Sequence, residues 1–379
     1  MKRLNIYLYS TQDITQMGGG GNSSSTTFKY LNKAGHHVTF FKSILEMEKA
    51  LIKSKPDIIL HHNIKDLDKV YPISKKLDIP LLSTINNLIT CQTGVHIKYD
   101  SNFGVPCFKC SFFKGLVCQI KEKNVRPLNE KLSALFFYPL RYYNRNQRIK
   151  LLNDINGIIA ISPTLKKLLR INGVKNKIYV CNQPIDDDML IKPQKRLHFD
   201  KKTIFYQGGG EPFKGVRVLI EAFIKLKQDD TKLLIAGDIR KENNLNIKLI
   251  QHKYPNIKFL GQVSVDDIKK YYYSSDIFVF PSLWFEAFGR GWAEAACCGK
   301  PIITFRGRGG SSDFLSNNVN ALVIEPRMND IVLAMDKLLN DGKLRNKLAK
   351  NVKEFAKQNL VASKVADKLT SIYDEVLKL

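Results

Sequence analysis

The chain lacks several features that would point to a membrane-spanning or repetitive protein. No run of about 18 uncharged apolar residues occurs, so the sequence predicts no transmembrane helix. The apolar start is short and soon reaches polar residues, a pattern that argues against a signal peptide. No repeat of about 20 to 50 residues and no long low-complexity tract is visible, which disfavours solenoids and propellers.

Cysteine is scarce, and its number is odd. Seven cysteines in 379 residues, without an export signal, argue against a disulfide framework and for a reducing cytoplasm. Two expectations remain open for the four that cluster: a structural zinc held by thiolates, or unligated thiols in a loop insertion. No activating histidine set accompanies them, so a catalytic metal is not expected. The four are Cys91, Cys107, Cys110 and Cys118, spaced Cys-x(15)-Cys-x(2)-Cys-x(7)-Cys.

Acidic residues are also few: 35 Asp and Glu stand against 60 Lys and Arg, giving a formal charge of +25. Such a charge favours polyanionic partners, namely nucleic acid, anionic lipid or phosphorylated substrates, although a general lysine bias would produce it too. The segment 109–150 carries ten basic and two acidic residues among many Phe and Tyr. This mixture favours an anionic membrane surface, and a packed helix pair with a solvated basic face is the alternative.

What the chain does contain indicates two α/β domains. Short β-branched or aromatic runs alternate with amphipathic stretches, the pattern of parallel sheets covered by helices. A polar, proline-containing stretch at 183–202 separates two such series. We expect a first domain over 1–190 with a cysteine-containing insertion at 91–118, a second over 191–355, and a helix over 356–379 that returns to the first. Expected strands are 4–9, 37–41, 57–61, 81–84 and 157–161, then 203–206, 232–236, 257–260, 277–280 and 301–305.

The most informative segment is 281–295, in which Glu286 and Glu294 stand with seven residues between them. If a helix begins near Gly289, both carboxylates flank its amino terminus. That terminus offers unpaired backbone donors and a positive dipole end, and Gly289 and Gly291 allow a diphosphate to approach the main chain. Carboxylates repel phosphate and pair with hydroxyls, so a nucleotide sugar fits both features. The alternative is a capping Glu286 and an ordinary surface Glu294.

This segment resembles the donor-site signature of the retaining glycosyltransferase family 4, whose members have the GT-B fold of two Rossmann-like domains facing a cleft. Further blocks support the resemblance in order along the chain. They are Gly35-His36-His37-Val38, Ile159-Ala160-Ile161-Ser162, Leu234-Ile235-Ala236-Gly237-Asp238, Phe259-Leu260-Gly261-Gln262-Val263, Gly299-Lys300-Pro301-Ile302-Ile303 and Gly309-Gly310-Ser311-Ser312-Asp313.

The resemblance implies site roles. Glu294 would hold the ribose hydroxyls, Glu286 would contact the transferred sugar, and Lys214 in the glycine-rich loop would offset the charge of the departing diphosphate. The further donor-binding residues that it implies are Phe288, Gly289, Arg290, Gly208, Gly209, Val263 and, from the glycine run of the first domain, Gly19 and Gly20.

Two positions depart from the family pattern. Gly209 stands where an Arg is usual, so Arg290 and Arg217 are the candidates for a second phosphate cation. Asn86 stands where a His often contacts the sugar, and an amide can donate a hydrogen bond but cannot titrate near neutral pH.

The resemblance implies an enzyme that moves a hexose-type sugar from a UDP- or GDP-sugar to a glycan or lipid-linked acceptor of a bacterial cell envelope. The family needs no metal or other cofactor for catalysis. We expect a cytoplasmic protein, peripheral on the inner face of the membrane, and no nucleic-acid partner. The rival hypothesis is a non-catalytic basic protein that binds RNA or anionic lipid on a decayed transferase scaffold.

Overall fold

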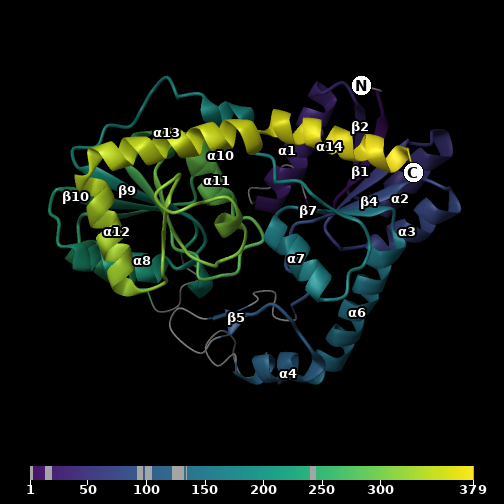
Figure 1. Ribbon diagram of the computed structural model, residues 1–379, viewed down its shortest axis with the longest axis horizontal. Coiled ribbons are helices and arrows are strands. Elements are labelled where there is room, and N and C mark those ends of the chain that lie inside the picture. Colours follow the sequence, from purple (N-terminus) through teal and green to yellow (C-terminus); the bar gives the residue numbers. More distant parts are fainter. Residues whose placement is uncertain are drawn as a thin grey trace. The chain divides into compact units, whose positions relative to one another are not determined.

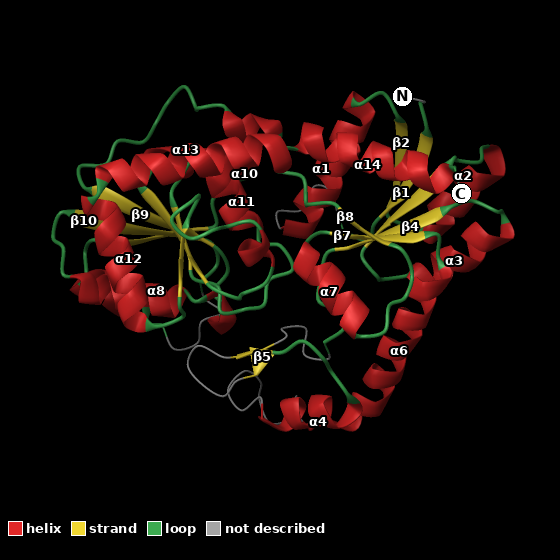
Figure 2. Cartoon of the chain, viewed as in Figure 1, coloured by secondary structure: helices red, strands yellow, loops and turns green. Residues whose placement is uncertain are grey.

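The computed structural model describes residues 3–12, 19–91, 97–98, 105–121, 132–133, 135–239 and 245–378. The chain divides into two units. Unit 1 comprises Met1–Pro184 and Ala362–Leu379, and unit 2 comprises Ile185–Val361. Both are α/β units built on parallel sheets, so the predicted fold class is confirmed (Figures 1 and 2). No helix in these described ranges is both long enough and apolar enough to cross a bilayer.

Unit 1 contains a parallel sheet with the strand order β2-β1-β3-β4-β7-β8. The side chains of its inner strands are almost all buried, as expected when helices cover both faces of a sheet, whereas the edge strands β2 and β8 are partly exposed. The strand bounds are β1 (Asn5–Tyr9), β2 (His37–Phe41), β3 (Ile58–His62), β4 (Leu81–Ile85), β7 (Gly157–Ala160) and β8 (Ile178–Val180). The helices are α1 (Gly19–Lys33), α2 (Ile44–Lys53), α3 (Leu67–Lys76), α4 (Phe112–Lys121), α6 (Tyr138–Asp154) and α7 (Pro163–Ile171), and β5 (Ile97–Lys98) pairs with β6 (Val105–Pro106).

The last helix, α14 (Ala362–Leu377), packs on unit 1. Its apolar face joins the core formed by β1, β3 and α1, and the Thr370 hydroxyl lies 2.8 Å from His36 Nε2. The helix predicted over 356–379 is thus two elements, because α13 (Gly342–Asn359) belongs to unit 2 and ends before the buried Leu360 and Val361.

The boundaries of unit 2 differ from the predicted 190 and 355 for a physical reason. Ile185 and Val361 pair in a parallel bridge. The short turn η1 (Asp187–Leu190) is held to the same unit by its Met189 carbonyl, which accepts hydrogen bonds from Tyr273 Oη at 3.0 Å and Cys298 Sγ at 3.5 Å. The start of the predicted linker is therefore packed structure.

Unit 2 repeats the architecture with the strand order β11-β10-β9-β12-β13-β14, again parallel throughout. Its strands are β9 (Lys202–Gln207), β10 (Thr231–Ala236), β11 (Ile257–Gly261), β12 (Ile277–Phe280), β13 (Ile302–Phe305) and β14 (Leu322–Ile324). Its helices are α8 (Val216–Leu226), α9 (Ile247–Lys253), α10 (Val265–Ser274), α11 (Arg290–Cys297), α12 (Met328–Asn340) and α13, with the 3-10 turns η2 (Pro212–Lys214) and η3 (Gly310–Asp313).

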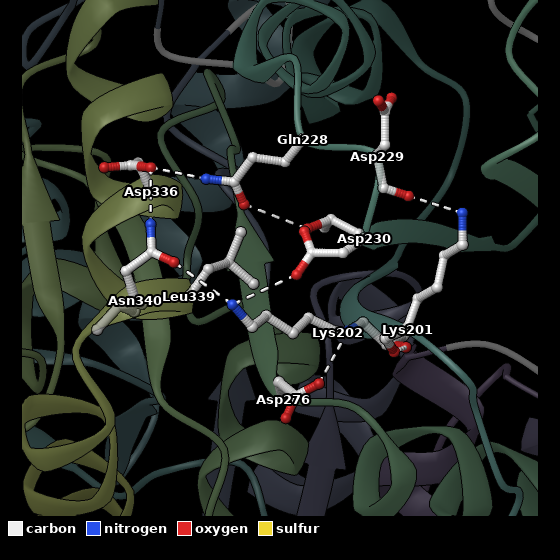
Figure 3. Close-up of polar contacts among 12 residues, drawn as sticks. Lys201, Lys202, Gln228, Asp229, Asp230, Asp276, Asp336, Leu339 and Asn340 are labelled. Carbon is white, nitrogen blue, oxygen red and sulfur yellow. Dashed lines mark hydrogen bonds and ion pairs between the residues drawn. The ribbon is translucent and has the colours of Figure 1, made fainter.

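Charged and polar side chains close the amino edge of this sheet, where β9, β10 and β12 begin (Figure 3). Lys202 Nζ lies 3.5 Å from Asp230 and 3.4 Å from Asn340 Oδ1. Asp336 accepts hydrogen bonds from Gln228 Nε2 at 2.7 Å and Asn340 Nδ2 at 2.9 Å. The network ties α12 to the sheet, and its members are partly or largely exposed.

Candidate active site

The carboxyl edge of the unit 2 sheet has the geometry of a ligand site. From β9 the chain adds β10 and β11 on one side, then returns to add β12, β13 and β14 on the other. The order therefore reverses between the neighbours β9 and β12, and ligands of open α/β sheets bind in the crevice that such a reversal leaves at the carboxyl ends. The loop after β9 carries Lys214, and the loop after β12 carries Glu286.

Lys214 and Glu286 meet at this reversal. Lys214 Nζ donates to Glu286 Oε1 at 2.8 Å, and Ser282 Oγ donates to the same oxygen at 3.0 Å. The Glu286 side chain is only 8% exposed and that of Lys214 24%. Among the described residues both bonds to this carboxylate fall on Oε1, which leaves Oε2 able to accept from a hydroxyl. The two residues to which the resemblance assigns the diphosphate and the transferred sugar thus lie within hydrogen-bonding distance of each other.

Trp284 completes this group, and sequence reasoning missed it. Lys214 Nζ lies 4.4 Å from the centroid of the indole, a cation–π distance, and Phe213 packs edge-on against the same ring. The backbone N–H groups of Leu283 and Trp284 donate to the Phe213 carbonyl at 2.8 and 3.0 Å, which joins the loops after β9 and β12. The indole Nε1 is buried and has no hydrogen-bond partner within the described residues.

The turn into α11 forms as the sequence predicts. Gly289 precedes the helix with φ +87°, a left-handed conformation that disfavours other residues, and a Cβ there would lie 2.8 Å from Phe280 Cζ. The N-cap residue Gly289 has no side chain to cap α11, which leaves the backbone N–H groups of the first helical turn without that partner. Phe288 is buried against Trp292, whose Nε1 donates to the Phe288 carbonyl at 2.6 Å. Phe288 thus shapes the turn through packing.

Glu294 lies in a second polar group one turn into α11. Arg290 Nε donates to Glu294 Oε1 at 3.2 Å, and Tyr272 Oη donates to Oε2 at 3.3 Å. Tyr272 Oη also lies 3.3 Å from Gln207 Oε1, at the end of β9. Burial, followed by the charge of Glu294, raises the pKa of Tyr272 well above its usual range, so the hydroxyl stays a neutral donor. Neither Tyr272 nor Gln207 carried a signal in the sequence.

The glycine-rich loop after β9 approaches other backbone closely. A Cβ at Gly208 would lie 2.5 Å from Tyr206 Oη, and one at Gly210 would lie 2.6 Å from the main chain of Ile239. The Tyr206 hydroxyl donates to the Gly209 carbonyl at 3.0 Å. These contacts leave no room for side chains at 208 and 210, whose N–H groups donate to the carbonyls of Ala236 and Asp238.

The loop after β13 supports Glu286 from a third direction. Glu286 N–H donates to the Arg308 carbonyl at 3.1 Å, and Gly310 N–H donates to the Glu286 carbonyl at 2.7 Å. Ser311 Oγ, at the start of η3, is buried and unpartnered among the described residues. The Gly309-Gly310 block, noted only as part of the family resemblance, holds the backbone of the site.

Other predicted residues lie away from this group. Arg217 is half-exposed and its Nε donates to Glu221 Oε1 along α8, so as the second phosphate cation it is less well placed than Arg290. Val263 is half-buried after β11, at the edge of the sheet. Asn86, half-buried after β4, and Gly19 and Gly20, at the start of α1, belong to unit 1.

The four cysteines, for which a structural zinc and unligated thiols were the two expectations, all lie in unit 1. Within the described ranges, which include all four cysteines, no three His, Cys, Asp or Glu side chains gather closely enough to hold a metal ion. Cys91 follows β4, Cys110 lies just before α4, and Cys118 lies within α4. Cys107 Sγ and Cys110 Sγ lie near backbone carbonyls of their own turn, at 3.8 and 3.7 Å.

Two histidines that sequence reasoning passed over end β3 in unit 1. His62 Nδ1 lies 3.0 Å from Ser24 Oγ, and His61 stacks on Tyr9 with ring centroids 5.5 Å apart. Burial lowers the pKa of His61 to about 4 and that of His62 to about 3, so both rings are neutral at pH 7. The sequence signal that could have indicated these two histidines is their position at the end of an apolar run, because ligands bind at the carboxyl ends of parallel strands.

Comparison with known proteins agrees with this geometry. Residues 188–355 match the family model described as glycosyl transferases group 1. A putative glycosyltransferase, YtcC of Bacillus subtilis, is 30% identical over 189 residues, which is 47% of this chain and 46% of that protein. The chain therefore matches about half the length of this relative.

Two wider matches cover nearly the whole chain. The capsular polysaccharide biosynthesis glycosyltransferase CapM of Staphylococcus aureus is 27% identical over 91% of this chain and 98% of its own. The solved structure of Anabaena HepE in complex with UDP-glucose superposes with a TM-score of 0.68 at 14% identity, covering 98% of this chain and all of that one. The chain thus has the GT-B type of α/β fold, and the part of it that is similar to group 1 glycosyl transferases is residues 188–355.

Proposed function

We propose that the protein is a retaining glycosyltransferase of family 4. It transfers a hexose-type sugar from a nucleotide diphosphate sugar to a glycan or lipid-linked acceptor in bacterial envelope polysaccharide synthesis. One observation carries the proposal: the ion pair between the half-buried Lys214 and the buried Glu286 at the reversal between β9 and β12. A cation for phosphate and a carboxylate for hydroxyls, within 2.8 Å of each other, match the place where a sugar joins a diphosphate.

The donor fits the remaining groups in the same unit. The amino terminus of α11 would receive the diphosphate through backbone N–H groups. In the glycine loop the N–H groups of Gly208 and Gly210 already donate to the carbonyls of Ala236 and Asp238, so Gly209 would supply the donor there. Glu286 Oε2 would accept from hydroxyls of the transferred sugar. Glu294, held by Arg290 and Tyr272, would accept from the ribose hydroxyls.

In this reaction the protein forms no covalent bond with the substrates. The bond between sugar C1 and the phosphate oxygen breaks, the acceptor oxygen bonds to C1 on the same face, and the departing phosphate oxygen takes the acceptor proton. Negative charge grows on the diphosphate as it leaves. Lys214 interacts more strongly with that charge than with the ground state, which is the condition for lowering the barrier. No metal or other cofactor is needed for this step.

Two of the similar proteins support the proposed classes of donor and acceptor. HepE was solved with UDP-glucose, and CapM is named for capsular polysaccharide synthesis, so we propose a UDP- or GDP-hexose and an envelope glycan or its lipid-linked precursor. Unit 1 would bind the acceptor, with Asn86 after β4 as a hydrogen-bond donor to the sugar. The protein would work in the cytoplasm, at the inner face of the membrane.

The test begins with donor binding. A panel of UDP- and GDP-hexoses is screened for thermal stabilisation, because a ligand at a hundred times its Kd adds about 2.7 kcal/mol. With the donor so identified, release of the nucleoside diphosphate is measured for wild type, Lys214→Ala and Glu286→Gln. Lys225→Ala, an exposed lysine on α8, is the matched control. NMR of the product then shows whether the anomeric configuration is kept.

Three outcomes would contradict the proposal. Full activity in Lys214→Ala or Glu286→Gln would reject the assignment of the site. A product with inverted anomeric configuration would reject the retaining mechanism. If no nucleotide sugar stabilises the protein while RNA binds with a steep salt dependence, the non-catalytic alternative replaces it.

A further inference from the structure

The exposed aromatic side chains of the described residues gather on one part of unit 1. Phe113 on α4 is 77% exposed and Phe136, just before α6, is 79% exposed. Every large exposed aromatic side chain in the described part of the chain lies between residues 108 and 143. We call the following set the aromatic surface: Phe108, Phe113, Val117, Phe136, Phe137, Leu140 and Tyr143.

These side chains are not needed to hold α4 and α6 together. Tyr138 is buried between the helices, and its hydroxyl donates to the Phe112 carbonyl at 2.7 Å. The Phe112 ring packs on Tyr138 at 5.2 Å and edge-on against Tyr142 at 5.3 Å. Gly115 leaves the space that the Tyr138 hydroxyl occupies. The pair thus has its own aromatic contact, and the aromatic surface is additional to it.

The helix pair is also anchored firmly to unit 1. The buried Arg145 on α6 donates through Nε to the Thr90 carbonyl and through NH2 to Asn172 Oδ1, each at 2.9 Å. Asn172 in turn donates to the Phe108 carbonyl at 2.9 Å. Figure 1 shows α6 running from α4 to α3 beside the sheet of unit 1. A surface held in this way presents its exposed rings in a defined orientation.

In the two described segments that carry the aromatic surface, the charged side chains have one sign. Residues 107–121 and 132–150 contain seven Lys and Arg and no Asp or Glu. Lys114, Arg141, Arg148 and Lys150 among them are exposed. Aromatic rings that insert at the headgroup level, with cations beside them, are the composition that binds anionic bilayers. A second copy of the same surface would bring like charges face to face, which disfavours a symmetric dimer here.

We propose that the aromatic surface inserts into the headgroup region of a bilayer that contains anionic phospholipid, and so sets unit 1 on the membrane. The inference rests on the proposed function for its purpose, the capture of a lipid-linked acceptor. Thr90, to which Arg145 is bonded, lies four residues after Asn86 on the loop that leaves the carboxyl end of β4. Insertion therefore fixes the acceptor-binding edge of unit 1 relative to the lipid surface.

Flotation with vesicles tests the proposal without any enzymatic assay. Wild-type protein is mixed with vesicles of phosphatidylglycerol and phosphatidylcholine, and separately with phosphatidylcholine alone. We expect binding to the first, and at least a tenfold weaker partition for the double variant Phe113→Ser/Phe136→Ser. The matched control is Ile52→Ser, which removes a side chain that is 85% exposed on α2 of the same unit and should not change the partition.

A charge series separates electrostatic attraction from insertion. Arg141→Glu/Arg148→Glu should weaken binding to the anionic vesicles by roughly fivefold or more for each residue, and added salt should reduce the wild-type affinity. Lys53→Glu, on the exposed part of α2, is the control. Circular dichroism of every variant establishes that the fold is kept.

The results decide between membrane and other partners. Failure of wild type to float, or equal loss in the α2 controls, would overturn the proposal. So would self-association of the wild type that the aromatic variants abolish, because the surface would then join two copies. Donor binding is measured on the wild type and on the same variants. If the wild type binds the donor but does not float with the vesicles, the membrane surface is rejected and the transferase proposal stands. If it floats but binds no donor, the transferase proposal is rejected and the membrane surface stands.

Discussion

The two edges of the unit 2 sheet differ in how far their charged side chains are exposed to solvent. At the amino edge, exposed partners such as Lys202 and Asp230 lie 3.5 Å apart and contribute little. At the carboxyl edge, Lys214 and a nearly buried Glu286 form a pair whose desolvation is costly. Beside it lies the buried indole N–H of Trp284, which has no hydrogen-bond partner in the part of the chain that the structure describes. Exposed ion pairs like those of the amino edge are compatible with a stable fold. The desolvated ion pair and the buried N–H group of the carboxyl edge cost stability, which is typical of a functional site.

Breaking the ion pair tests this comparison most strongly. Glu286→Gln keeps the shape of the side chain and removes its charge, and Lys214→Ala removes the cation. Each should lower kcat/KM by about a hundredfold or more, because charge placed for the transition state is lost. Steady-state rates with the donor found by thermal screening measure the effect. A loss of less than fivefold would show that the pair is structural.

Gly289 tests how far the same edge depends on backbone strain. In Gly289→Ala the new Cβ meets Phe280 and must adopt a φ near +87°. We expect a destabilisation of about 2 kcal/mol. Tryptophan fluorescence during urea unfolding follows unit 2 selectively, since both Trp284 and Trp292 lie in it. Unchanged stability would mean that the turn rearranges freely.

The comparison extends to the carboxyl edge of unit 1, where His61 and His62 are buried. Their pKa values of about 4 and 3 lie below the unfolded value of about 6.5, so they stabilise the unit fully above pH 6.5. That contribution is lost as the pH falls toward the folded values. The slope for one proton is about 1.4 kcal/mol per pH unit, and His62→Gln should remove about that much of it.

Hydrogen exchange of peptides from β1 and β3, corrected for intrinsic rates, measures this slope between pH 7 and pH 5. The amino-edge peptides of unit 2, which contain no buried histidine among the described residues, supply the reference. Parallel slopes in wild type and His62→Gln would contradict the assignment of the pH dependence to this ring.

The smallest effect is expected at the amino edge of unit 2. Asp336→Ala removes the acceptor for Gln228 and Asn340, but the group is exposed. The free energy of unfolding should fall by less than about 0.5 kcal/mol, and the transfer rate should not change. A large change in activity would mean that the two edges are coupled.

Local pattern predicted most of the fold. The expected strands at 37–41 and 277–280 match β2 and β12 residue for residue, because apolar β-branched runs bounded by turns depend little on distant contacts. β8 and β14 were missed, since three residues carry too little periodicity. Asp187 was assigned to the first domain but belongs to unit 2, because the unit boundaries depend on the bridge between Ile185 and Val361.

The candidate site was predicted in part. Glu286, Lys214 and the turn at Gly289 came from motifs in which the residue types themselves carry the chemistry. Trp284, Ser282 and Tyr272 were not found, since a tryptophan, a serine or a tyrosine is equally at home in a core. Their roles depend on which loop faces them across the sheet.

The α/β class, the glycine turn before α11 and a carboxylate on each side of that turn could be predicted from the sequence, because they depend on residues adjacent in the chain. The contact of Lys214 with Glu286, 72 residues away, and the position of Trp284 against the cation depend on how the strands are ordered in space. The reason is the strand order: β12 returns to pair with β9, and that pairing brings the two loops together.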